Sequence, residues 1–268
     1  MEVIQDKKNG DHGSPKSPQR NRPLTSKQEK KLVDYLDETF LELTRNFKKR
    51  SEESSTLKTL SSYIDAARHL LALILQIPPL DPSTGLRVAY LLRLTGDSLG
   101  AIPGYTLGTE TSVNRETLQD IIDFLDDLDE AWLAVLQGQI WDPETAAGVD
   151  LIVPVDMTSR TPNSNGGSST VPTNLKSTPP SQTDIARLRS LIFAGESVLE
   201  EWLASQRANV DAQADHGDEL EDVSGMLARM GLLHEFDSLF VRTLDYLGGF
   251  AASVSRNVVD PPEESMME

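Results

Sequence analysis

The sequence predicts an all-α protein: a helical bundle of about seven helices with a disordered N-terminal tail and a Ser/Thr/Pro/Gly-rich internal linker. Apolar residues recur every three or four positions over long segments, and helix-start motifs and prolines bound these segments. No segment alternates apolar and polar residues between hairpin turns. We expect a tail over 1–24, a bundle over 25–155, a linker over 156–181, C-terminal helices packing on the bundle over 182–255, and a second tail over 256–268.

The first helix is expected over residues 27–49. It opens on the capping box Ser26-Lys27-Gln28-Glu29, with a hydroxyl at the N-cap and a carboxylate three residues later. The second helix is expected over residues 56–76. Pro78 and Pro79 end it, because proline disfavours helical conformation in the residue before it.

The third helix is expected over residues 82–94, with Asp81 as its N-cap and Pro82 in its first turn. Its apolar side chains cover almost the whole circumference, which is typical of a helix buried on all sides. Arg87 and Arg93 lie within it and need partners if they are buried. The glycines from 96 to 108 predict an irregular loop.

The fourth helix is expected over residues 115–140 and has the clearest apolar stripe, formed by Leu118, Ile121, Ile122, Leu125, Leu128, Trp132, Leu136 and Ile140. Asp129 falls inside this stripe. A buried carboxylate needs a cation, so we predict a structural ion pair between Asp129 and Arg93, with Arg87 and Arg68 as alternative partners.

Three further helices are expected after the linker. The first, over residues 183–206, opens on a capping box from Ser181 to Asp184. A shorter helix is expected over 218–230, and the last over 236–247, closed by two glycines.

Composition excludes several classes of function. The 268 residues include 25 Lys and Arg and 42 Asp and Glu, giving a net charge of −17, so the chain as a whole should repel nucleic acid. The absence of cysteine excludes disulfides and thiolate metal sites. The longest apolar run, Leu70–Ile77, is too short to span a membrane. We expect an intracellular protein of the nucleus or cytoplasm.

No motif for catalysis, cofactor binding or metal binding is found. The four histidines lack metal-ligand spacing, no Gly-Lys dipeptide supports a phosphate-binding loop, and no Gly-x-Ser-x-Gly elbow occurs. We therefore predict a non-catalytic protein without a cofactor or a bound metal.

The candidate partner-binding residues lie on the fourth helix and near it. Residues 101–150 hold one basic and 11 acidic residues. Asp120, Asp123, Asp127 and Glu130 line the face opposite the apolar stripe, where they could bind a basic protein partner. Tyr105 and Trp141 are candidate exposed anchors for such a partner.

The first 50 residues are weakly basic, with 12 basic and 8 acidic residues. If nucleic acid binds, it should bind this end of the chain. Ser14 and Ser17 each precede a proline, so both are candidate phosphorylation sites, and phosphates there would reverse the local charge.

Several segments, including Ala67–Leu71, Gly85–Arg87, Tyr90–Asp97, Asp126–Asp129 and Trp141–Pro143, resemble uncharacterised helical proteins of filamentous fungi. The resemblance extends over about half of the chain. Some of those proteins carry a meiotic-recombination label, which implies an accessory factor in nuclear DNA transactions as an alternative to an interaction subunit or adaptor. A third hypothesis is an enzyme with a buried Asp/Arg site.

Overall fold

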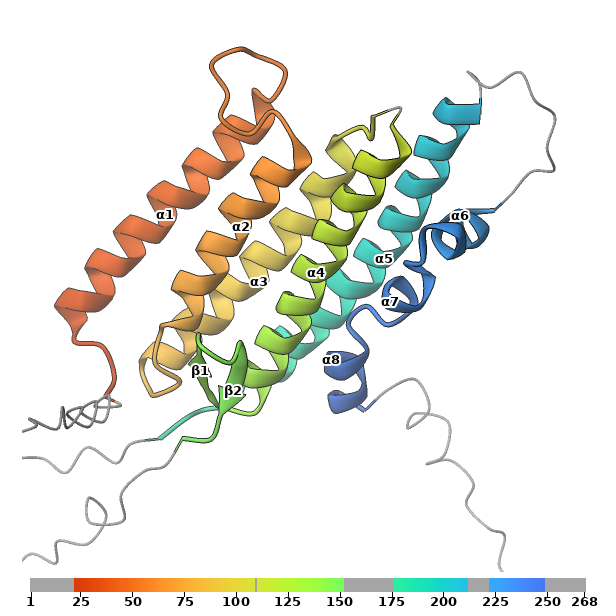
Figure 1. Ribbon diagram of the computed structural model, residues 1–268. Helices are drawn as coiled ribbons and strands as arrows, with labels where there is room; N and C mark the ends of the chain where they lie inside the picture. Colours follow the sequence, from red (N-terminus) through yellow and green to blue (C-terminus); the bar gives the residue numbers. More distant parts are fainter. Residues whose placement is uncertain (1–21, 109, 152–175, 212–221, 249–268) are drawn as a thin grey trace, which may run out of the picture.

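The computed structural model describes residues 22–108, 110–151, 176–211 and 222–248, and it confirms the all-α prediction (Figure 1). The described residues form α1 (Ser26–Lys48), α2 (Leu60–Leu75), α3 (Ser83–Ala101), a 3-10 turn (Ile102–Gly104), α4 (Thr111–Leu136), α5 (Gln182–Asp211), α6 (Val223–Met230), α7 (Leu233–Asp237) and α8 (Val241–Tyr246). Two three-residue strands, β1 (Ile140–Asp142) and β2 (Ala147–Val149), form an antiparallel hairpin.

Five long helices lie side by side, and the three short C-terminal helices pack against them (Figure 1). α2 contacts α1, α3 and α4, while α5 packs along α3 and α8 packs on α4. Because α2 lies in the middle, most of its apolar side chains are buried, among them Ile64, Leu70 and Ile74. Burial of each such apolar side chain contributes about 2 kcal/mol to the stability of the folded protein.

The two predicted capping boxes behave differently. The box of α5 is confirmed, since Ser181 Oγ accepts from the Asp184 amide at 3.2 Å and the Asp184 carboxylate accepts from the Ser181 amide at 3.1 Å. α1 begins one residue early, with Thr25 and Gln28 making the reciprocal bonds. Thr25 supplies the same hydroxyl as Ser26, which explains the shift.

α3 continues through Gly96 and Gly100, where the sequence predicts a loop. Gly96 serves close packing of α3 on α5 instead, whereas a Cβ added at Gly100 would meet nothing within 4 Å. A Cβ at Gly96 would lie 3.4 Å from Leu191, and a Cβ at Gly195 of α5 would lie 2.6 Å from Leu99. Only glycine fits at 195 without displacing Leu99, which is buried.

α4 ends four residues earlier than predicted, because Gly138 adopts the left-handed conformation (φ 68°) that commonly follows a helix end. Ile140 therefore lies in β1, where it pairs with Val149. The predicted last helix is two helices, α7 and α8, separated at the buried Phe240, whose φ is 54°.

Arg87 is buried in α3, and its Nη1 donates to the carbonyl oxygen of Gln139 at 2.7 Å. The acceptor lies just beyond the end of α4, where the helix dipole favours a cation. Burial lowers the pKa of Arg87 to about 10. Arg87 therefore ties the start of α3 to the end of α4.

Candidate functional site

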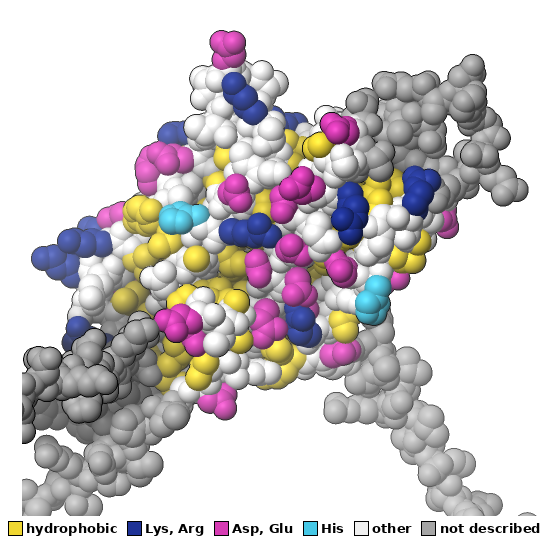
Figure 2. Space-filling model, viewed as in Figure 1, with side chains coloured by type: hydrophobic (Ala, Val, Ile, Leu, Met, Phe, Trp, Pro, Cys, Tyr) yellow, Lys and Arg dark blue, Asp and Glu magenta, His cyan; other side chains and the backbone are white. Residues whose placement is uncertain are grey.

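The acidic surface predicted on α4 is present. Asp120, Asp123, Asp127 and Glu130 follow one another at helical spacings of three, four and three residues, so they lie on one face of α4. With the exposed Asp126, these residues form what we call the α4 ridge. Figure 2 shows carboxylates gathered around a few arginine or lysine side chains on the face that carries α2 and α4.

Arg68 of α2 holds the first part of the α4 ridge. Its Nε lies 3.5 Å from Asp127 Oδ2, and its Nη2 donates to the carbonyl oxygen of Asp120 at 3.1 Å. Loss of solvent raises the pKa of the half-buried Asp127, and the positive charge of Arg68 opposes this rise. The pair therefore fixes the Asp127 side chain against α2.

Arg242 of α8 holds the second part. Its Nε lies 3.2 Å from Asp129 Oδ2 and 3.3 Å from Glu130 Oε2, and its Nη2 contacts Asp126. One guanidinium thus bridges three carboxylates of α4. Arg242 lies 113 residues after Asp129 in the chain, so local sequence patterns could not identify it as their partner.

The predicted contact between Asp129 and Arg93 is wrong, although Asp129 is buried as its position in the stripe predicts, with 1% of its surface exposed. Its carboxylate accepts from the backbone amides of Arg242, at 3.2 Å, and Thr243, at 2.8 Å. Asp129 therefore caps the N-terminus of α8 from a neighbouring helix.

Arg93 lies on the side of α3 that faces α1, which is why it cannot reach Asp129. Its Nη1 lies 3.1 Å from Asp37 Oδ1, its Nε lies 3.8 Å from Asp97 Oδ2, and its guanidinium lies 4.3 Å from the centre of the Phe40 ring. The cation thus joins α1 to α3 at the surface.

The α4 ridge retains an excess of negative charge. Within the described ranges, two guanidinium groups pair with four of the six carboxylates: Arg68 with Asp127, and Arg242 with Asp126, Asp129 and Glu130. Asp123 is exposed and accepts from the Gln119 side-chain amide at 2.8 Å. These carboxylates are thus held in place and remain underneutralised, which suits a basic partner.

Tyr105 is not an exposed anchor, contrary to the prediction. The residue is 5% exposed, and its hydroxyl donates to the carbonyl oxygen of Leu57 at 3.0 Å. The centre of its ring lies 5.7 Å from the centre of the Phe47 ring. Burial raises the pKa of Tyr105 to about 12. The carbonyl oxygen of Tyr105 also accepts from Trp202 Nε1 at 2.8 Å. The glycine- and proline-rich segment that contains Tyr105 therefore folds toward the core.

Trp141 lies in β1 and is half-buried against the core. Its exposed part could still meet a partner, so its role stays a prediction. Ser14 and Ser17 lie outside the described residues, and so do the predicted tails apart from residues 22–24. The described part of the linker, 176–181, packs near the α2–α3 turn.

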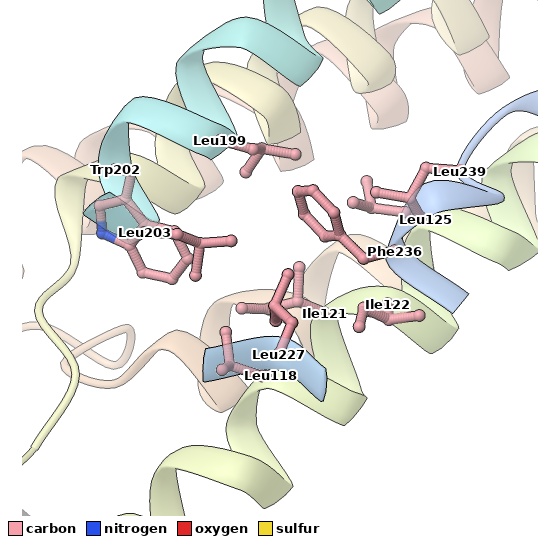
Figure 3. A pocket seen from close by; sticks show the side chains of 10 residues that line it. All are labelled: Leu118, Ile121, Ile122, Leu125, Leu199, Trp202, Leu203, Leu227, Phe236 and Leu239. Carbon is pink, nitrogen blue, oxygen red and sulfur yellow. The ribbon is translucent and has the colours of Figure 1, made fainter. Parts of the chain in front are cut away.

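A second feature is the apolar seam between α4 and α5, which side chains of the C-terminal helices fill (Figure 3). Leu239 lies beside Leu125, the Phe236 ring extends into the seam toward Leu199, and Leu227 lies beside Leu118. The seam retains a cavity of about 10 Å³, roughly the size of one water molecule. It is therefore a packing interface that attaches α6 and α7 to the bundle.

Within the described ranges, no group of three or more acidic or histidine side chains is arranged to hold a metal ion. In the same part of the chain, none of the helices combines the length and apolar character needed to cross a membrane.

Comparison of the chain with protein-family models gives no match, and comparisons with curated proteins and with solved structures give none either. The fold and the α4 ridge therefore define an all-α protein with an acidic helix face.

Proposed function

We propose that this chain is a non-catalytic interaction subunit or adaptor, and that the α4 ridge binds a basic segment of a protein partner. The observation that carries the proposal is the excess, among the described residues, of carboxylates over guanidinium groups on one face of α4. A lysine- or arginine-rich segment supplies the missing positive charge.

The two arginine bridges support this proposal. Arg68 and Arg242 hold Asp127, Asp126 and Glu130 in defined positions before any partner arrives. A partner then loses less free energy in ordering these side chains, which favours binding. Complementary charge also speeds association, particularly at low salt.

The test is the affinity of the full chain for a fluorescent 15-residue peptide rich in Lys and Arg, measured by anisotropy. The double substitution Asp120→Asn with Asp123→Asn should weaken binding about fivefold, because two charges at an interface rim contribute about 1 kcal/mol together. Neither change removes a contact to Arg68 Nε or to Arg242.

The matched control is Glu38→Gln with Glu42→Gln, which removes the same charge from two exposed positions of α1. The proposal expects this variant to bind like the wild type. Equal weakening by both variants would mean that only the net charge of the protein matters, and it would refute a site on α4.

The alternative of an accessory factor in nuclear DNA transactions rests on the fungal resemblance and on the basic first 50 residues. It predicts DNA binding that falls steeply with salt and disappears when residues 1–23 are deleted. The enzyme alternative has less support, since both Asp129 oxygens accept from the α8 backbone. Placement in the nucleus or cytoplasm and phosphorylation of Ser14 and Ser17 remain parts of the proposal.

A further inference from the structure

Thr178 makes a two-point contact with Asp81 at the turn between α2 and α3. The Thr178 hydroxyl donates to Asp81 Oδ2 at 2.6 Å, and its amide donates to Oδ1 at 3.3 Å. In the opposite direction, the Asp81 amide donates to the carbonyl oxygen of Lys176 at 2.8 Å. These three hydrogen bonds attach residues 176–181, which lead into α5, to the α2–α3 turn.

The same threonine has the features of a kinase substrate. Pro179 follows it directly, as proline-directed kinases require, and both side chains are exposed. Residues 176–181 belong to no helix or strand, so an enzyme could bind them in extended form without unfolding a helix.

We propose that Thr178 is a phosphorylation site for a proline-directed Ser/Thr kinase, and that its phosphate detaches residues 176–181 from Asp81. The kinase transfers the γ-phosphoryl group of ATP to Thr178 Oγ1. The new bond joins phosphorus to Oγ1 while the bond between the γ-phosphorus and its bridging oxygen breaks. The hydroxyl proton passes to the catalytic base of the kinase, and ADP leaves.

Detachment follows from charge. Phosphorylation replaces the hydroxyl donor with a group carrying a charge of about −1.5 to −2, next to a carboxylate. The hydrogen bond from Thr178 is the main cause that holds the pKa of Asp81 below its ordinary value, so this carboxyl is ionised at neutral pH. Two anions at hydrogen-bonding distance repel each other, and no donor remains on the Thr178 side chain.

The first experiment treats the full chain with ATP and a purified proline-directed kinase, and maps phosphopeptides by mass spectrometry. Phosphate is expected on Thr178 and absent there in Thr178→Ala. A peptide of residues 172–184 serves as the positive control for the kinase. If the peptide is phosphorylated while Thr178 of the folded chain is not, the site is refuted.

The second experiment measures hydrogen exchange of the Asp81 amide before and after phosphorylation. Exchange of the Asp81 amide should accelerate at least about tenfold, because its hydrogen bond to the carbonyl oxygen of Lys176 breaks when residues 176–181 detach. In Asp81→Asn, phosphorylation should change this exchange much less, because the carboxylate charge is gone. Unchanged exchange in phosphorylated wild-type protein, or equal acceleration in both proteins, would overturn the detachment.

The proposal is independent of the α4 ridge. A chain that binds the basic peptide normally could fail both Thr178 tests, and a chain that binds no peptide could pass them.

Discussion

Single residues decide how the C-terminal helices attach, and Asp129 is the clearest case. Its position in the apolar stripe predicts burial and the need for a cation; Asp129 is buried, and its cation is Arg242 in place of the predicted Arg93. Its partner could not be predicted, because the cap comes from the amides of α8 more than a hundred residues away. Sequence periodicity identifies which side of a helix is buried and leaves open what packs there.

Replacing Asp129 by Asn should lower the free energy of unfolding by about 2 kcal/mol or more. The amide group of Asn can accept from only one of the two α8 amides, and its NH₂ group would face the other donor. Chemical denaturation monitored by circular dichroism measures the loss.

The matched control is Asp123→Asn, an exposed change on the same helix, which should alter stability by less than about 0.5 kcal/mol. Similar losses in both variants would show that Asp129 does not cap α8.

The pKa of Asp127 is a second property that depends on the surroundings of a single residue. Desolvation raises its pKa above the ordinary 3.8, so the folded protein holds this proton more tightly than the unfolded chain. Its contribution to stability therefore decreases as the pH rises from below 3.8 through the folded-state pKa.

In Arg68→Met the pKa of Asp127 should rise further, because a charge that lowers it has been removed. NMR titration of the side-chain carboxyl resonance measures both values. A pKa that falls in the variant would mean that Arg68 does not act on Asp127 as the ion pair implies.

At the scale of elements, the long amphipathic helices were predictable and the short features were not. α1, α2, α4 and α5 follow from apolar spacing, and capping motifs also predict the starts of α1 and α5. The sequence does not predict the extension of α3, because glycines at 96 and 100 are a turn signal, whereas in the structure Gly96 allows close contact with Leu191 of α5. The break at Phe240 has no local signal, since its burial depends on packing against distant helices.

The contact between α3 and α5 gives a direct test at this scale. Gly195→Ala should destabilise the protein by about 1–3 kcal/mol, because the new Cβ would lie 2.6 Å from a side-chain carbon of the buried Leu99. Thermal or chemical unfolding measures this change.

Gly85→Ala is the matched control. Nothing lies within 4 Å of its added Cβ, so the better helix propensity of alanine should stabilise α3 by about 0.5 kcal/mol. If Gly195→Ala were also stabilising, α3 and α5 would have to pack less closely than described here.

At the scale of the whole molecule, charge is unevenly distributed, and this supports the proposed function most. The sequence predicted the acidic face of α4 and the candidate residues Asp120, Asp123, Asp127 and Glu130, which do share one face. It did not predict that Arg68 and Arg242 bridge them, because both bridges join separate helices. The proposed site is thus a sequence-encoded row of charges whose rigidity comes from tertiary contacts.

A charge swap tests the α4 ridge most directly. Asp120→Lys with Asp123→Lys should lose affinity for the Lys- and Arg-rich peptide and gain affinity for a Glu-rich peptide of the same length, while Glu38→Lys with Glu42→Lys should do neither. Anisotropy titrations at low salt measure all four combinations. If the ridge variant keeps its affinity for the basic peptide, or the α1 variant switches equally, the α4 ridge is not the binding site.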